Sequence, residues 1–143
     1  MPGIIIADRI EAESGSQLVL DNGVALTPPT ISDVNNVEIG TFCRALVNFN
    51  GTGTVAIRRS FNVSSITDNG VGNYTINFTN NMPDANYVMV GNGGTTVPSP
   101  APIAINNTTA PTTSACRLIQ WYMTATTDQG PVDGTWNNAA FFR

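Results

Sequence analysis

Short apolar runs, each closed by residues that favour turns, recur from Ile39 to the C-terminus. The run Tyr74-Thr75-Ile76-Asn77-Phe78 alternates large apolar with polar side chains, which is the period-two signature of a strand with one buried face. Between such runs lie loops rich in Gly and Asn, which accept left-handed backbone. No segment keeps helical periodicity for more than about one turn. The pattern predicts an all-β chain with a single β-sandwich or jelly-roll-like domain.

We expect strands at the apolar runs of this domain, namely residues 45–49, 55–63, 74–78, 87–90, 117–124 and 135–143. The strand at 87–90 should stop at Gly91-Asn92-Gly93-Gly94, because consecutive glycines punctuate structure. Residues 92–115 are rich in Thr, Pro, Asn, Ala and Gly, and they are predicted to form a long surface excursion. Tyr74 and Tyr87 lie in apolar strands and are expected in the core.

The first 38 residues have a different character. Their short β-branched and leucine runs flank Asp21-Asn22-Gly23, a hairpin signal, but they contain too few large side chains to build a core. Three copies side by side would bury these runs together. We therefore predict an N-terminal β arm over residues 1–38, a sandwich domain over 39–143 and an intertwined homotrimer. The expected oligomer interface consists of Ile4, Ile5, Ile6, Ile10, Leu18, Leu20, Val24 and Leu26.

Charge excludes several classes of protein. Only 11% of the residues are charged, against about 25% in ordinary domains, and the net charge is −4. A nucleic-acid binder needs a clustered positive field, which this composition does not provide. The sequence shows no secretory signal and no run near the roughly 20 apolar residues of a membrane span. We expect no nucleic-acid or membrane partner and synthesis in a cytoplasm.

Catalytic and metal chemistry have little support. The chain has no histidine, so Ser-His and Cys-His activation are absent, and its aspartates fall in turn sequences. Cys43 and Cys116 form no CxxC motif, and a zinc site lacks a ligand set. The two thiols are expected to be core groups, with a disulfide as the alternative. We predict no enzymatic activity, no metal and no cofactor.

The middle of the chain resembles a module of bacteriophage virion proteins. The likeness is carried by residues 45–58, which read ALVNFNGTGTVAIR, and by residues 61–70, which read FNVSSITDNG. It continues through 72–78, GNYTINF, and 82–87, MPDANY. Similar proteins occur in tail fibres, tails and capsid accessories of phages, including cyanophages. Leu46 departs from the module, which commonly has tryptophan there.

The resemblance implies a structural virion protein made in a bacterial host. Because the chain is short, we favour a trimeric cement protein or head fibre that decorates the capsid and contacts the major capsid protein or other virion proteins. The alternative is a short tail fibre that binds a host surface glycan. For that alternative the predicted recognition residues are Trp136, Asn137 and Asn138, because tryptophan stacks on sugars and these residues follow a turn.

Overall fold

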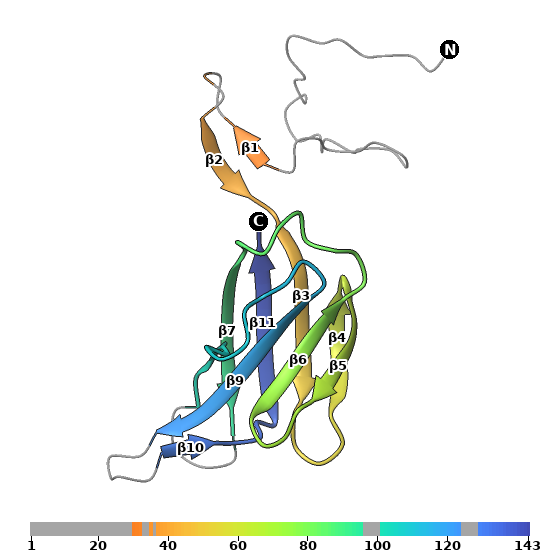
Figure 1. The fold of residues 1–143 in the computed structure, drawn as a ribbon, viewed down its shortest axis with the longest axis vertical. Helices are drawn as coiled ribbons and strands as arrows, with labels where there is room; N and C mark the ends of the chain where they lie inside the picture. The colour runs from red at the N-terminus through yellow and green to blue at the C-terminus, as the bar shows by residue number, and fades with distance from the viewer. Residues whose placement is uncertain (1–29, 33–34, 36, 96–100, 124–128) are drawn as a thin grey trace, which may run out of the picture.

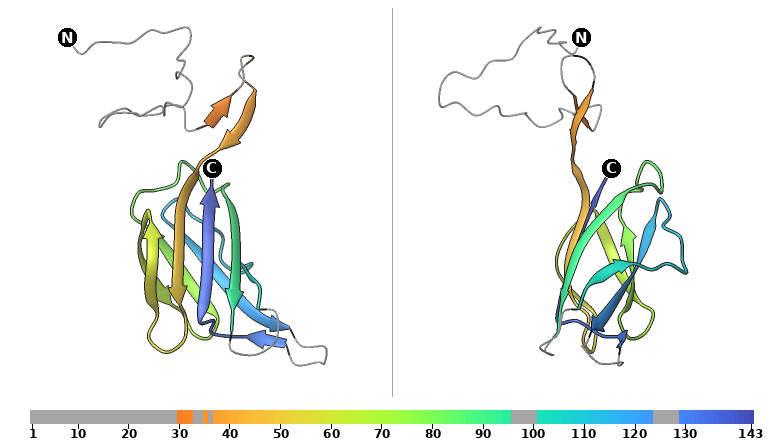
Figure 2. Two further views of the ribbon diagram at one scale, coloured as in Figure 1. Left: turned by 180° about the vertical axis from the view of Figure 1, so that it is seen from behind. Right: turned by 90° about the vertical axis from the view of Figure 1, so that its left-hand side faces the viewer.

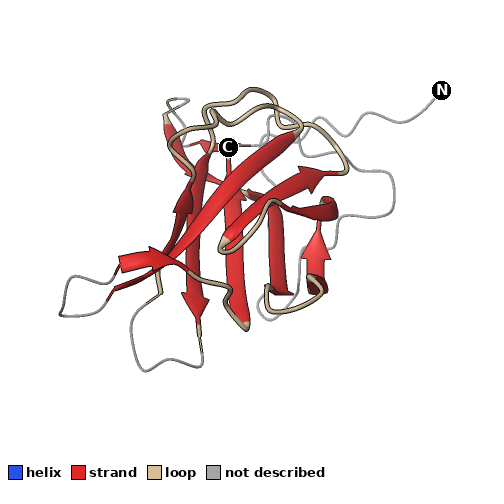
Figure 3. Cartoon of the chain, turned by 60° about the horizontal axis from the view of Figure 1, so that its bottom comes forward, coloured by secondary structure: helices blue, strands red, loops and turns tan. Residues whose placement is uncertain are grey.

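The computed structural model describes residues 30–32, 35, 37–95, 101–123 and 129–143. This part of the chain forms strands and loops and contains no helix (Figure 3). It therefore offers no helix long and apolar enough to cross a membrane. The strands are β1 (Thr30–Ser32), β2 (Glu38–Thr41), β3 (Cys43–Asn50), β4 (Ala56–Phe61), β5 (Val63–Asp68), β6 (Asn73–Phe78), β7 (Val88–Gly94), β8 (Ile103–Ile105), β9 (Ala115–Met123), β10 (Gln129–Pro131) and β11 (Trp136–Phe142).

Two antiparallel sheets face each other, as in a β-sandwich (Figures 1 and 2). The first has the strand order β4-β3-β11-β7. The second has the order β10-β9-β6-β5, with β8 also paired to β9. The all-β fold predicted from the apolar runs is confirmed at this level, and the jelly-roll connectivity stays a prediction.

A separate hairpin, β1 paired with β2, projects past the end of the sandwich where the chain terminates (Figure 1). Phe42 separates β2 from β3, so the hairpin leads directly into the first sheet. The predicted domain boundary at residue 38 falls where β2 begins. The predicted arm runs and the interface residues Ile4, Ile5, Ile6, Ile10, Leu18, Leu20, Val24 and Leu26 lie outside the described residues.

The chain changes sheets at Asn62. This residue has a φ of 54°, in the left-handed region that Asn tolerates better than most side chains. Its side-chain nitrogen donates to the Arg44 carbonyl at 2.9 Å, and its side-chain oxygen accepts from the Asn80 amide at 2.7 Å. The single strand predicted to run from residue 55 through 63 is therefore wrong: β4 ends at Phe61, and β5 starts in the other sheet at Val63.

The core lies between the sheets and is aromatic at one end. Phe78, Tyr87 and Phe141 meet edge to face with centroid separations of 5.1 to 5.8 Å. Such edge-to-face pairs add about 0.5–1.5 kcal/mol each beyond their buried area. Phe49 makes a similar contact, at 5.0 Å, with Tyr74. Both tyrosines predicted for the core are buried there.

Two predictions around residues 87–115 are wrong. Strand β7 continues through the glycines to Gly94 instead of stopping at Val90. Gly91 and Gly93 face inward, where the absence of a side chain lets Ile103 and Gln120 of the second sheet approach the strand closely. Residues 101–115 are also more than a surface excursion, because β8 pairs with β9 and Ala101, Ile103 and Asn106 are buried.

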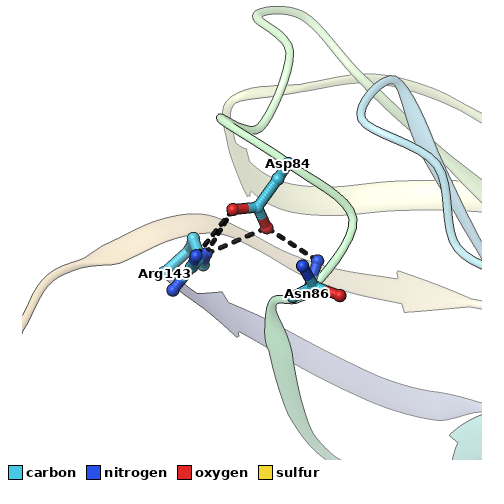
Figure 4. A network of polar contacts seen from close by, with 3 residues as sticks. All are labelled: Asp84, Asn86 and Arg143. Atoms are coloured by element: carbon cyan, nitrogen blue, oxygen red, sulfur yellow. Dashed lines mark hydrogen bonds and ion pairs between the residues drawn. The ribbon is translucent and has the colours of Figure 1, made fainter.

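An ion pair ties the C-terminal strand to the turn before β7 (Figure 4). The Arg143 Nη2 atom lies 2.6 Å from Asp84 Oδ2, and its Nε donates to Asp84 Oδ1 at 2.9 Å. Asp84 Oδ1 also accepts from the Asn86 amide at 2.7 Å. The Arg143 hydrogen bonds, followed by the Asn86 hydrogen bond, lower the pKa of the Asp84 carboxyl.

Candidate interaction surface

Polar side chains on the outer face of β5 and β6, in the second sheet, form hydrogen bonds with one another. The Asn77 side-chain nitrogen lies 3.1 Å from both Ser65 Oγ and Thr67 Oγ1. Asn69 donates to Thr75 Oγ1 at 2.9 Å. Along β6 such polar side chains alternate with buried apolar ones, as in an antiparallel sheet with one solvated face, and β5 is mostly exposed. The β5–β6 part of this face is suited to contact with water.

The outer face of the first sheet has the opposite character. A row of four apolar side chains crosses all its strands, because the register pairs Phe61 with Leu46, Leu46 with Ala140 and Ala140 with Val90. A second pair, Val88 and Phe142, lies beside this row. Phe61, Val88 and Val90 are 57–62% exposed. We call these six residues the apolar face: Leu46, Phe61, Val88, Val90, Ala140 and Phe142.

The apolar face continues into a shallow hollow of about 490 Å³. One wall consists of Leu46, Val90 and Ala140, and the other is the next cross-strand row, which contains Asn48, Asn138 and Arg59. Asn48 donates to Asn138 Oδ1 at 2.6 Å, so these two amides are held in place. Apolar groups bordered by fixed amides and an arginine are typical of protein–protein contact surfaces.

The structure separates the three predicted recognition residues. They are consecutive in β11, and successive strand residues point to opposite faces. Trp136 is 58% exposed, and Asn138 is half-buried on the outer face. Asn137 is completely buried, so its prediction as a surface residue is wrong. The Arg58 guanidinium lies 4.1 Å from the centroid of the Trp136 ring and donates to the Thr135 carbonyl at 2.6 Å, so one face of the indole is already covered.

Asn137 belongs to a buried polar cluster at the end of the sandwich opposite the C-terminus. The Tyr74 hydroxyl donates to Asp133 Oδ1 at 2.7 Å, and the Gly72 amide donates to the same oxygen at 2.7 Å. The Asn137 side-chain nitrogen donates to the Gly134 carbonyl at 2.8 Å. Burial, followed by the hydrogen bond to Asp133, raises the pKa of the Tyr74 hydroxyl far above its usual value. The hydrogen bonds of this cluster hold neighbouring loops together, which is a structural role.

Both cysteines carry free thiols, so the disulfide alternative is not the observed state. Cys116 is fully buried, as the core-thiol interpretation predicts, and burial raises its pKa to about 11. Cys43 is only half-buried. It lines a second hollow together with Arg44 and Phe61, at the rim of the apolar face.

The sequence contains a signal for the apolar face that the prediction missed. Leu46-Val47, Val88-Met89-Val90 and Ala139-Ala140-Phe141-Phe142 are continuous apolar runs, which are typical of strands covered on both sides. β6, by contrast, alternates cleanly. The two kinds of run therefore separate β6, which has a polar outer face, from the strands that carry the apolar face.

Within the described ranges, no three His, Cys, Asp or Glu side chains gather as a metal-binding group. Comparisons with family models, with curated proteins and with solved structures gave no match for this chain.

Proposed function

We propose that this protein is a structural component of a bacteriophage particle, and that it acts as a trimeric capsid-decorating protein without enzymatic activity. The apolar face carries the proposal. An antiparallel sheet exposed to water presents polar side chains outward, as β5 and β6 of the second sheet do, whereas the first sheet presents an apolar row across all four strands. The likeness of residues 45–87 to phage virion modules supplies the biological setting.

The mechanism is mechanical. A subunit that buries its apolar face against other subunits gains roughly 25 cal/mol for each Å² of apolar surface removed from water. Stable interfaces bury about 1,200–2,000 Å² in total, which several strands of a sheet can supply. Trimers attached to neighbouring coat subunits would then resist outward pressure from the packaged DNA.

A matched pair of substitutions tests self-association. Val90→Asp places a charge on the apolar face, at the β7 end of the cross-strand row, and should reduce a trimer to monomers in light scattering, because burying an unpaired carboxylate in an interface is strongly unfavourable. Val71→Asp is the control, since Val71 is 59% exposed, almost as much as Val90, but lies in the loop between β5 and β6. A wild-type protein of monomer mass, or equal effects of the two variants, would refute the proposal.

The place of action needs a separate test. Cryo-microscopy of the phage particle should show trimeric density of this chain on the capsid shell. Density on the tail would favour the second candidate instead.

That second candidate is a short tail fibre that binds a host glycan, and one observation favours it. Trp121 is 43% exposed and lines a hollow of about 420 Å³ with Asn107 and Thr108 on the second sheet. An indole beside amide and hydroxyl groups suits a sugar ring better than Trp136, which Arg58 covers. Purified protein that blocks phage adsorption, with the block lost in Trp121→Ala, would establish this function.

A further inference from the structure

The apolar face requires a partner that is both apolar and acidic. Strands β3, β4, β7 and β11 contain no Asp or Glu, but Arg44 and Arg59 point outward beside the apolar row. Neither arginine forms an ion pair with a described residue. Two such faces packed on one another would bring arginines together without a carboxylate between them. A second copy of the same face is therefore a poor complement.

The N-terminal segment, residues 1–29, has the required composition. Residues 1–38 carry six of the ten acidic side chains and one of the six arginines, whereas residues 39–143 carry four acids and five arginines. Within residues 1–29, four acids (Asp8, Glu11, Glu13 and Asp21) alternate with the apolar runs 4–6, 18–20 and 24–26. Apolar and acidic groups thus recur along one short stretch of chain.

Length permits the contact. The described structure begins in the hairpin beyond one end of the sandwich (Figure 1). Twenty-nine extended residues span up to about 95 Å, whereas the seven-residue strand β11 is only about 23 Å long. The segment can therefore reach the sandwich of a neighbouring copy and cross its sheet.

We infer that the apolar face of each copy is covered by residues 1–29 of a neighbouring copy, with acidic side chains of that segment beside Arg44 and Arg59. This inference rests on the proposed self-association and names the surface that the segment occupies. Each copy both gives a segment and receives one, a head-to-tail contact that three copies can close into a ring.

The native cysteines report on this contact. Cys43 lies at the rim of the apolar face, and Cys116 is buried and serves as an internal control. In the full-length trimer, maleimide should label Cys43 slowly. In the double variant Leu18→Asp/Leu20→Asp, maleimide should label Cys43 about tenfold faster or more. Cys116 should stay unlabelled, because the domain is still folded around it. Ser14→Asp/Ser16→Asp adds the same charges at polar positions and should leave labelling slow.

A mixing experiment tests whether the contact is made between chains. Val90→Asp chains have an intact N-terminal segment but a disrupted apolar face. Leu18→Asp/Leu20→Asp chains have an intact apolar face but a disrupted segment. Each alone should be monomeric, and a mixture should form a heterodimer in light scattering. No association in the mixture overturns the inference. If the wild type is a trimer and Cys43 reacts equally slowly in the wild type and in every variant, the inference is wrong but the proposed function stands. If the wild type is a monomer, both are wrong.

Discussion

Gly93 has no side chain, and this absence lets the second sheet approach β7 closely. A Cβ at this inward-facing position would overlap the Gln120 side-chain nitrogen and lie 2.6 Å from the Ala101 carbonyl oxygen. Gln120 is completely buried and cannot move aside without disturbing the core. We expect Gly93→Ala to lower the free energy of unfolding by about 1–3 kcal/mol, measured by urea denaturation.

The neighbouring residue provides the control for that prediction. A Cβ on Gly94 would meet its nearest atom, Trp136 Cβ, at the ordinary contact distance of 3.5 Å. Gly94→Ala should change the free energy of unfolding by less than about 0.5 kcal/mol. Equal losses in the two variants would show that glycine content, and not the close approach of the sheets, governs the stability of β7.

At the scale of the element, clean alternation predicts strands better than continuous apolar runs do. β6 was predictable from its own residues because every second side chain is buried. β9 overlaps the apolar run predicted as a strand over residues 117–124, yet its polar Gln120 faces the core and its Trp121 faces outward. The Gln120 side-chain nitrogen donates to the Ala101 carbonyl at 3.3 Å, a contact between distant parts of the chain that no local pattern reveals. Asn137 was mistaken for a surface residue because an amide beside a turn is typical of the surface, although its side-chain nitrogen bonds the nearby Gly134 carbonyl inside the sandwich.

The last strand is held by a long-range ion pair whose contribution should depend on pH. The pKa of Asp84 is lowered from its usual value of 3.8, chiefly by Arg143. A lowered folded pKa means that the stabilisation is present above the unfolded pKa and is lost as the pH falls through the folded value. Asp84→Asn should therefore be slightly less stable than wild type at pH 7 and equally stable near pH 2, in urea titrations at both pH values. Because both side chains are partly exposed, the difference should be small and should shrink in high salt. A difference that persists at pH 2 would show that the amide disturbs the turn itself.

At the scale of the whole molecule, burial of acidic hydroxyl and thiol groups makes the core sensitive to base. Burial raises the pKa values of Tyr74 and Tyr87 above the usual 10.0, and it raises that of Cys116 from 9.0 to about 11. In the unfolded chain these groups lose their protons first, so the unfolded state holds fewer protons and is favoured as the pH rises. The free energy of unfolding should be steady from pH 7 to 9 and fall between pH 9 and 11. Urea titrations across this range check the expectation, and an unchanged value at pH 11 would contradict it.

The hydroxyl and amide lattice on the second sheet has a consequence for how large an assembly can grow. A particle that adheres on two opposite sides adds further particles without limit and ends as a filament or a precipitate. Here the outer face of β5 and β6 carries polar side chains, among which Asn77 donates to Ser65 and Thr67. In the proposed assembly, growth through the sandwich faces would therefore have a single direction and would stop once each apolar face is covered.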